Sequence, residues 1–360
     1  MVEIPVRLGP RSYRILVGTG LHAGIGSELV RLKVGRKVAL VTDSSIQALH
    51  GETVSRSLAE ARFDVTRVLL PEGEAAKTLE VAASTWDRFL EAGLDRTSTV
   101  VALGGGAVGD LAGFTAATYM RGVNFVQVPT TLLAQVDASI GGKTAIDHAR
   151  AKNLIGAFYQ PRLVIADTAA LLTLPEREYR SGMAEVIKHG IVLDAAYFAE
   201  VERGAAALRA REPATLEAIV AGSCRLKASV VERDEQEAEL RHVLNYGHTI
   251  GHAVEAITGY QRFAHGEAVS LGIAAEAAIA ERLGLAGPAT RARQVAALEA
   301  VGLPVRGVGE PPERVVEALS RDKKAKDGRV PFVLAPEIGA FRLVYDVPRG
   351  TILDALADLG

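Results

Sequence analysis

The residues Thr99–Asp110, TVVALGGGAVGD, lead from an apolar stretch into a cluster of glycines, and this passage decides the fold. Its first residues are β-branched or aliphatic and predict a buried strand, and a helix is expected from Leu111 to Met120. A strand, a glycine turn and a helix in this order are typical of α/β proteins whose ligands lie at the carboxyl ends of parallel strands.

The glycines of this turn have the spacing G-x-G-x-x-G, at Gly104, Gly106 and Gly109. Glycine lets backbone amides approach a diphosphate closely, and the following helix N-terminus adds partial positive charge. However, the turn follows roughly the third strand, and no acidic residue stands about 20 positions later to hold a ribose. On these residues alone, a dinucleotide site and a plain glycine turn are equally good interpretations.

Strands and helices alternate on both sides of this passage. Helical patterns such as Gly51–Ala61 and Thr78–Ala92 lie between apolar runs, which predicts a doubly wound parallel sheet. Asp43, Gly104–Asp110 and Thr130–Thr131 then fall at carboxyl ends of strands. The predicted strands are Lys37–Thr42, Asp64–Leu70, Thr99–Leu103, Val123–Val128 and Leu163–Ala166.

The sequence changes character after Thr173-Leu174-Pro175. Ala-, Leu-, Glu- and Arg-rich stretches with helical period extend from about Tyr179 to Val301, and a small pair of strands is expected at Pro331–Leu334 and Ala340–Tyr345. The prediction is therefore an N-terminal Rossmann-like, doubly wound parallel sheet in residues 1–174, followed by a mainly α-helical domain in residues 175–360.

Composition narrows the class of protein. A chain of 360 residues exceeds one ordinary hydrophobic core, and 41 basic against 43 acidic residues is too balanced for a protein that coats nucleic acid. The single cysteine, Cys224, excludes an internal disulfide and a thiolate metal cluster and fits a reducing cytoplasm. Because the chain has neither a signal peptide nor an apolar run of about 18 residues, we expect no membrane association and a cytoplasmic location.

A second glycine string, Asp137–Thr144, has the letters DASIGGKT. A Walker A loop needs its first glycine where Asp137 stands, which argues against nucleoside triphosphate hydrolysis. Lys143 is better interpreted as a point charge for an anion. Other lysines and arginines beside short motifs could line the same kind of pocket or be solvated surface charge.

Four of the eight histidines, His242, His248, His252 and His265, fall within 24 residues. His248 and His252 are four apart on one helical face, as in a zinc helix, but Thr249 stands where a metalloprotease has glutamate. Satisfied core or surface histidines remain an alternative. Glu185 and Lys188, three apart, offer a carboxylate and a cation, although such pairs are often structural only.

Together these strings resemble the 3-dehydroquinate synthase family over nearly the whole chain. The motifs that carry the resemblance, in chain order, are PEGEAAK (71–77), GGGAVGD (104–110), YMRG (119–122), PTT (129–131), DASIGGK (137–143), KNLIGAF (152–158), MAEVIK (183–188), LNYGHT (244–249) and DKK (322–324).

The resemblance implies an NAD- and metal-dependent lyase that turns an anionic sugar phosphate, 3-deoxy-D-arabino-heptulosonate 7-phosphate, into 3-dehydroquinate and phosphate. It implies zinc, or cobalt in its place, on Glu185, His248 and His265, which makes His252 a neighbour of the site. The NAD residues that it implies are Asp43, Glu72, Glu74, Lys77, Gly105, Gly106, Gly109, Asp110, Thr130, Thr131, Asp137, Lys143, Lys152, Thr173, Leu174 and Glu178.

For the substrate and the chemistry, the resemblance implies a set of residues around the substrate's phosphate and carboxylate, completed by a second subunit. Arg121 would enter the neighbour's phosphate pocket in a homodimer. The remaining residues of this set are Lys143, Lys152, Asn153, Lys188, Lys227, Arg241, Asn245, His252 and one of Lys323 and Lys324. The alternatives are a related sugar-phosphate cyclase, a metal-dependent polyol dehydrogenase and a non-catalytic NAD-binding regulator.

Overall fold

The computed structural model describes residues 1–320 and 331–360. It divides into two compact units, Met1–Leu174 with Leu216–Gln236, and Pro175–Thr215 with Glu237–Gly360. Most of α8 (Pro213–Arg233) thus belongs to the first unit, whereas a division after residue 174 places it in the second. The reason is local bonding, because Cys224 and Lys227 of α8 bond to Gln135 and Asp137.

The centre of the first unit is a seven-stranded sheet with the strand order β1-β2-β9-β6-β5-β3-β4. Its neighbours run parallel except for the antiparallel edge pair β1 and β2, which the sequence analysis did not predict. The five predicted strands are all present. The strands are β1 (Val2–Val6), β2 (Tyr13–Gly18), β3 (Lys37–Asp43), β4 (Asp64–Leu70), β5 (Thr99–Gly104), β6 (Asn124–Pro129) and β9 (Leu163–Asp167).

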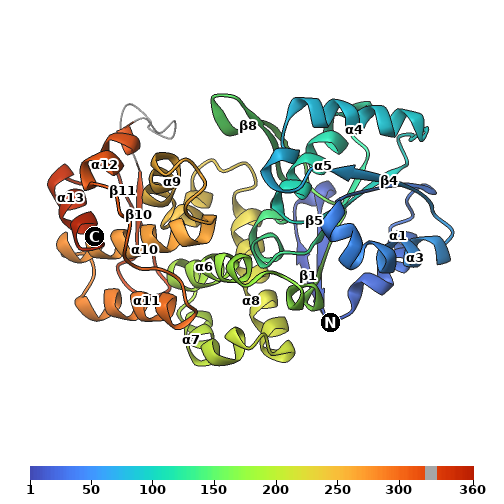
Figure 1. Ribbon diagram of the computed structural model, residues 1–360. Coiled ribbons are helices and arrows are strands. Elements are labelled where there is room, and N and C mark those ends of the chain that lie inside the picture. Colours follow the sequence, from blue (N-terminus) through green and yellow to red (C-terminus); the bar gives the residue numbers. More distant parts are fainter. Residues whose placement is uncertain (321–330) are drawn as a thin grey trace. The chain divides into compact units, whose positions relative to one another are not determined.

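Helices cover both faces of this sheet (Figure 1). Alternate residues of β3 divide between the two cores: Ala39 and Val41 pack with α4 (Leu79–Glu91) and α5 (Gly106–Thr118). Val38 and Leu40 pack on the other face with α1 (Ile25–Arg31) and α3 (Glu52–Glu60). This period of two confirms the doubly wound sheet.

The predicted ligand-binding end of the sheet lies at β3 and β5. These strands are neighbours, but the chain leaves β3 toward β4 on one side and later returns to β5 on the other. Such a switch point opens a crevice at the carboxyl ends of open α/β sheets. Asp43 ends β3, and Gly105 follows β5 and caps α5, which begins at Gly106 instead of the expected Leu111.

An antiparallel hairpin follows the second glycine string. It consists of β7 (Lys143–His148) and β8 (Ala151–Phe158), and Figure 1 shows it projecting from the sheet. Most of β8 is exposed, including Lys152 and Asn153. No alternation of buried and exposed residues marks this strand, so the sequence analysis missed it.

The second unit is mainly helical, as predicted, and includes the expected strand pair β10 (Phe332–Leu334) and β11 (Arg342–Val344). Its central helices are α6 and α10, in which Ser181–Val192 and Ala268–Ala280 are buried throughout. No helix in the described ranges is long and apolar enough to cross a membrane. The helices are α6 (Glu176–Leu193), α7 (Ala195–Arg209), α9 (His248–Ile257), α10 (His265–Arg282), α11 (Pro288–Ala300), α12 (Pro312–Ser320) and α13 (Arg349–Ala357).

Glycines bring three of these helices into close contact. A Cβ on Gly266 of α10 would overlap the carbonyl oxygen of Ser181 on α6. A Cβ on Gly272, further along α10, would overlap the carbonyl oxygen of Gly247, which precedes α9. Backbone therefore meets backbone at both contacts, next to the first residues of α9 and α10.

Candidate functional site

Glu185 and Lys188 lie in the fully buried part of α6. Their side chains are 0% and 1% exposed, and Lys188 Nζ is ion-paired with Glu185 Oε2. Burial alone would raise the pKa of Glu185, but Lys188, His248 and His265 outweigh it and hold that pKa well below its usual range. The carboxylate is therefore ionised and faces three nitrogen-bearing side chains.

His248 and His265 meet Glu185 from the first positions of α9 and α10. Glu185 Oε1 is 3.4 Å from His248 Nε2 and 3.7 Å from His265 Nε2. One ligand atom from each of the three residues lies within 4.8 Å of the others. One carboxylate and two imidazoles form a donor set that suits a catalytic zinc ion, with room left for a further ligand.

The second nitrogen of each ring also has a partner. His248 Nδ1 lies 3.0 Å from the carbonyl oxygen of Tyr246, and His265 Nδ1 lies 3.2 Å from Glu255 Oε1. Such partners orient each ring and, when the ring is neutral, keep its proton on Nδ1, so that Nε2 can bind a metal. Glu255 was missed by sequence reasoning, although it stands seven residues after His248, two turns along the same helix.

His252 lies beside this group. Its ring packs against those of His248 and His265, with centroids 5.2 Å and 6.1 Å away. His252, Glu255 and His265 form an overlapping group that could also hold a metal. The structure thus brings the predicted neighbour next to the predicted ligands.

Two further predicted residues lie on the short helix η8 (Leu240–Asn245). Arg241 is only 2% exposed, and Asn245 Nδ2 is 3.5 Å from His242 Nδ1. Glu178, predicted to contact NAD, is exposed on α6. Lys323 and Lys324 lie outside the described residues.

In the first unit, polar side chains gather at the switch point. Asp43 is buried, and its Oδ1 accepts bonds from the Ile46 amide and the Ser45 hydroxyl. Ser44 donates to Glu72, which brings the predicted Glu72 to the same strand end. A Cβ on Gly105 would lie 3.2 Å from Thr131 Cγ2, so the glycine leaves this surface open.

Lys77 is the centre of a second cluster in this unit. Its Nζ donates to Asp110 Oδ2 at 2.8 Å and to Asn153 Oδ1, and it lies 3.4 Å from Glu74 Oε1. Lys152 Nζ is 3.7 Å from the same Glu74 oxygen. Burial raises the pKa of Asp110 to about 6, against the opposing charge of Lys77. Residues predicted for NAD and for substrate therefore meet at Lys77.

Two other predicted residues have structural partners. Lys227 Nζ donates to Asp137 Oδ1 at 2.5 Å and to its carbonyl oxygen at 2.6 Å. Thr173 Oγ1 lies 3.1 Å from His50 Nε2. His50 was not predicted, since it stands 123 positions before Thr173 and the sequence carries no signal of this contact.

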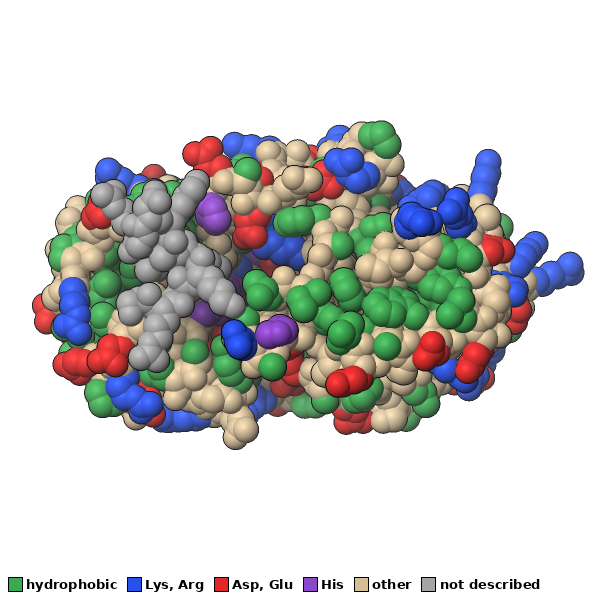
Figure 2. Space-filling view, turned by 90° about the horizontal axis from the view of Figure 1, so that it is seen from above, with side chains coloured by type: hydrophobic (Ala, Val, Ile, Leu, Met, Phe, Trp, Pro, Cys, Tyr) green, Lys and Arg blue, Asp and Glu red, His purple; other side chains and the backbone are tan. Residues whose placement is uncertain are grey.

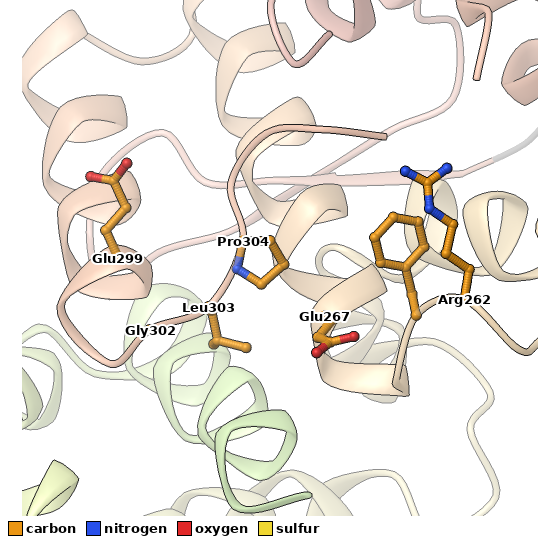
Figure 3. Close-up of a pocket in the computed structure, with 7 residues that line it drawn as sticks. Arg262, Glu267, Glu299, Gly302, Leu303 and Pro304 are labelled. Carbon is orange, nitrogen blue, oxygen red and sulfur yellow. The ribbon is translucent and has the colours of Figure 1, made fainter. Parts of the chain in front are cut away.

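An open cavity of about 600 Å³ lies in the second unit, apart from the candidate ligands. Figure 3 shows Arg262 and Glu299 at its two ends, with Leu303 and Pro304 between them. The side chain of its Glu267 accepts a hydrogen bond from the Ala264 amide and thereby caps α10, and it also pairs with Arg177. This arrangement gives Glu267 a structural role.

Comparison with known proteins identifies the class and the family. The family models for the N-terminal and C-terminal parts of 3-dehydroquinate synthase match residues 67–181 and 182–325. The 3-dehydroquinate synthase of Pelotomaculum thermopropionicum is 50% identical over 358 residues, covering 99% of this chain and 96% of the relative. That of Geobacter metallireducens is 53% identical over 344 residues, covering 96% of each chain.

Solved structures agree in fold over the full chain. A 2-deoxy-scyllo-inosose synthase complexed with carbaglucose-6-phosphate, NAD+ and Co2+ is 26% identical, with a TM-score of 0.89 and 100% of both chains covered. The 2-epi-5-epi-valiolone synthase of Streptomyces hygroscopicus, with NAD+ and Zn2+ bound, is 28% identical, with a TM-score of 0.89 and 100% and 99% coverage.

The fold and the site thus define an enzyme of the sugar-phosphate cyclase class. Within that class the chain belongs to the 3-dehydroquinate synthase family. It converts 3-deoxy-D-arabino-heptulosonate 7-phosphate into 3-dehydroquinate and phosphate. The curated relatives at about half identity favour this activity over the related cyclases, which are less similar.

Proposed function

We propose that Glu185, His248 and His265 bind the catalytic metal, zinc or cobalt. The observation that carries this assignment is the approach of three ligand atoms to within 4.8 Å around a fully buried carboxylate. A buried charge is costly unless it is matched, and two imidazoles and an ammonium group match it here. The donor set fits a hydroxyl-binding metal, and two cyclases of this fold have Co2+ or Zn2+ bound.

The NAD site is assigned to the switch point of the first unit. Gly105 caps α5 and Gly106 begins it, and at this helix N-terminus a diphosphate is favoured by hydrogen bonds and by the helix dipole. Asp43 and the Glu74–Lys77 string are assigned to the two riboses, and Thr130, Thr131 and Thr173 to further parts of the cofactor. The two solved cyclases also have NAD+ bound.

Lysine, arginine and asparagine side chains are assigned to the substrate's carboxylate and phosphate. These side chains are Lys143, Lys152, Asn153, Lys188, Arg241 and Asn245. Arg241 presents a planar fork that suits a carboxylate or a phosphate. Because it is almost fully buried, its charge interacts strongly with an anion.

When bound, NAD supplies a hydride acceptor that is regenerated within the turnover, and the metal supplies a Lewis acid for substrate hydroxyl groups. The residues of the chain orient the substrate and balance its charge while phosphate leaves. Within the described residues no separate general base is assigned, because the leaving phosphate can itself take the proton from the neighbouring carbon.

The test measures the phosphate released and the NADH formed in the same reaction. With the heptulosonate phosphate and substoichiometric NAD, phosphate should accumulate in every cycle while absorbance from NADH does not grow. Growth of NADH in step with product would reject this cycle in favour of a dehydrogenase. The variant His265→Ala should lose both zinc and activity, whereas Glu281→Gln, which removes a surface ion pair with Arg291, should keep both.

A symmetric homodimer with Arg121 shared between subunits is also part of the proposal. Arg121 is exposed, between α5 and β6, away from the carboxyl ends of the strands. Tyr159 links this loop to the end of β8, because its hydroxyl donates to the carbonyl oxygen of Val123 at 2.5 Å.

Exposed apolar side chains support that interface. Met120 is 43% exposed beside Arg121, and Leu154 and Phe158 of β8 are 59% and 47% exposed. Figure 2 shows apolar side chains gathered in a broad area of the first unit, with Lys and Arg side chains beside it. Apolar areas of this kind are typical of association surfaces.

A cytoplasmic location is proposed as well, because the only cysteine of the sequence, Cys224, is a buried thiol outside any disulfide.

A further inference from the structure

The peptide group that joins Tyr246 to Gly247 is hydrogen-bonded at both ends. Its carbonyl oxygen lies 3.0 Å from His248 Nδ1, and its N–H donates to Glu276 Oε2 at 2.7 Å. A ring nitrogen next to a carbonyl oxygen carries the proton, so His248 Nε2 keeps its lone pair toward Glu185. One continuous path of bonds thus leads from a carboxylate through a single peptide to His248.

Glu276 is fully buried in the middle of α10, and such a carboxylate is costly unless it is compensated. Close packing fixes Gly247 against the helix of Glu276. Gly247 has a φ of +77°, and a Cβ there would lie 2.6 Å from Ile273 Cγ1, one helical turn before Glu276. The turn that presents His248 therefore lies directly on the helix that carries Glu276.

The other side of this turn is fixed too. The Tyr246 hydroxyl donates to Gln294 Oε1 of α11 at 2.5 Å, and Tyr246 is completely buried. The Tyr246–Gly247 peptide thus has little freedom to rotate. Its orientation determines where the His248 ring points.

We propose that Glu276 is a positioning residue for the metal ligand His248 and acts through the Tyr246–Gly247 peptide. The inference rests on the proposed metal site. A carboxylate that accepts from the N–H strengthens the bond at the carbonyl end of the same peptide, because hydrogen bonds in series polarise one another. The stronger bond fixes the ring and makes Nε2 a better ligand.

The experiment uses the full chain, stripped of metal and titrated with Co2+. In Glu276→Leu, which has no acceptor, Co2+ affinity should fall by about 10- to 100-fold, and the visible absorption of the bound ion should change. In Glu276→Gln, which keeps an acceptor without the charge, affinity should fall measurably but less than in Glu276→Leu, by about tenfold, because charge-assisted hydrogen bonds are the stronger ones.

Ser270→Ala is the matched control. Ser270 is fully buried on the same helix, and its hydroxyl donates to the Pro304 carbonyl oxygen, away from the ligand turn. This variant should lose thermal stability but keep the parent's Co2+ affinity and spectrum. A stability loss in a Glu276 variant without a change in affinity or spectrum would be the signature of a purely structural role.

The outcomes separate the two proposals. If the parent chain does not bind Co2+, or if His248→Ala binds it as the parent does, the proposed metal site is wrong. If His248→Ala loses the ion but both Glu276 variants bind it with the parent's affinity and spectrum, only the role of Glu276 is overturned. Should Glu276→Leu fail to fold, the isosteric Glu276→Gln decides the question by itself.

Discussion

The two ring nitrogens of His265 each face a carboxylate. Nδ1 lies 3.2 Å from Glu255 Oε1, and Nε2 lies 3.7 Å from Glu185 Oε1, so Glu255 makes the shorter contact. The ring is thereby held at its second nitrogen by a carboxylate, as is usual for metal-binding histidines.

Loss of Glu255 should therefore weaken the metal site. We expect Glu255→Ala to lower zinc affinity by about 10- to 100-fold, because the ring loses its orienting partner. Competition with a chelator would measure the change. Glu202→Ala, which removes an ion pair with Arg293 elsewhere in the unit, is the control. Unchanged zinc affinity in Glu255→Ala would show that the contact does not orient the ligand.

Metal-free protein should lose stability as the pH rises. Burial lowers the pKa of His265, but Glu185 and Glu255 outweigh it and raise that pKa to about 10, against 6.5 for an ordinary histidine. A raised folded-state pKa stabilises the protein below the unfolded pKa, and this contribution disappears as the pH rises through about 10. The free energy of unfolding, measured by urea titration across this range, should fall less in His265→Gln. Equal slopes would contradict the shift.

Arg241→Ala should impair substrate use but not NAD binding. Removing a buried charge partner should cost about 2–5 kcal/mol in transition-state binding, measured as a loss of kcat/KM. Lys152→Ala, at an exposed position, should also lower kcat/KM, with less risk to folding. An equal loss of NAD affinity in Arg241→Ala would remove this residue from the substrate site.

Mixed dimers test the shared arginine. Arg121→Ala and Lys152→Ala should each be inactive alone, but activity should return when subunits exchange. In a heterodimer one site then holds both defects and the other site holds neither. If Arg121 serves its own subunit, each site keeps one defect and the mixture stays inactive.

Local patterns predicted five strands of the sheet, including the edge strand β4, but not the β1–β2 edge. The apolar runs that became β3, β5 and β6 are buried on both faces, so their sequences are unmistakable. The hairpin of β7 and β8 was missed because most of β8 is exposed and no buried face imposes a pattern on it. Likewise, nothing in α8 itself indicates that most of it belongs to the first unit, because tertiary bonds from Lys227 and Cys224 decide this.

Local sequence patterns predicted less of the candidate site than of the fold. Helical spacing pairs His248 with His252, and these two rings do pack together. The group around Glu185, however, consists of His248 and His265, so that three different helices supply it. Only the resemblance to a family pointed to that set, and the roles of its members stay predictions. Glu276 could not be found in this way, because its partner is a backbone amide that every residue except proline carries.

The contacts at Gly266 and Gly272 limit which residues can replace these two glycines. Because backbone touches backbone there, even one added methyl group would push α10 away from α6 or from the start of α9, and the distances among Glu185, His248 and His265 would widen. These two positions should thus tolerate substitution as poorly as the ligands do. The spacing of the three proposed metal ligands thus depends on two residues that have no side chain.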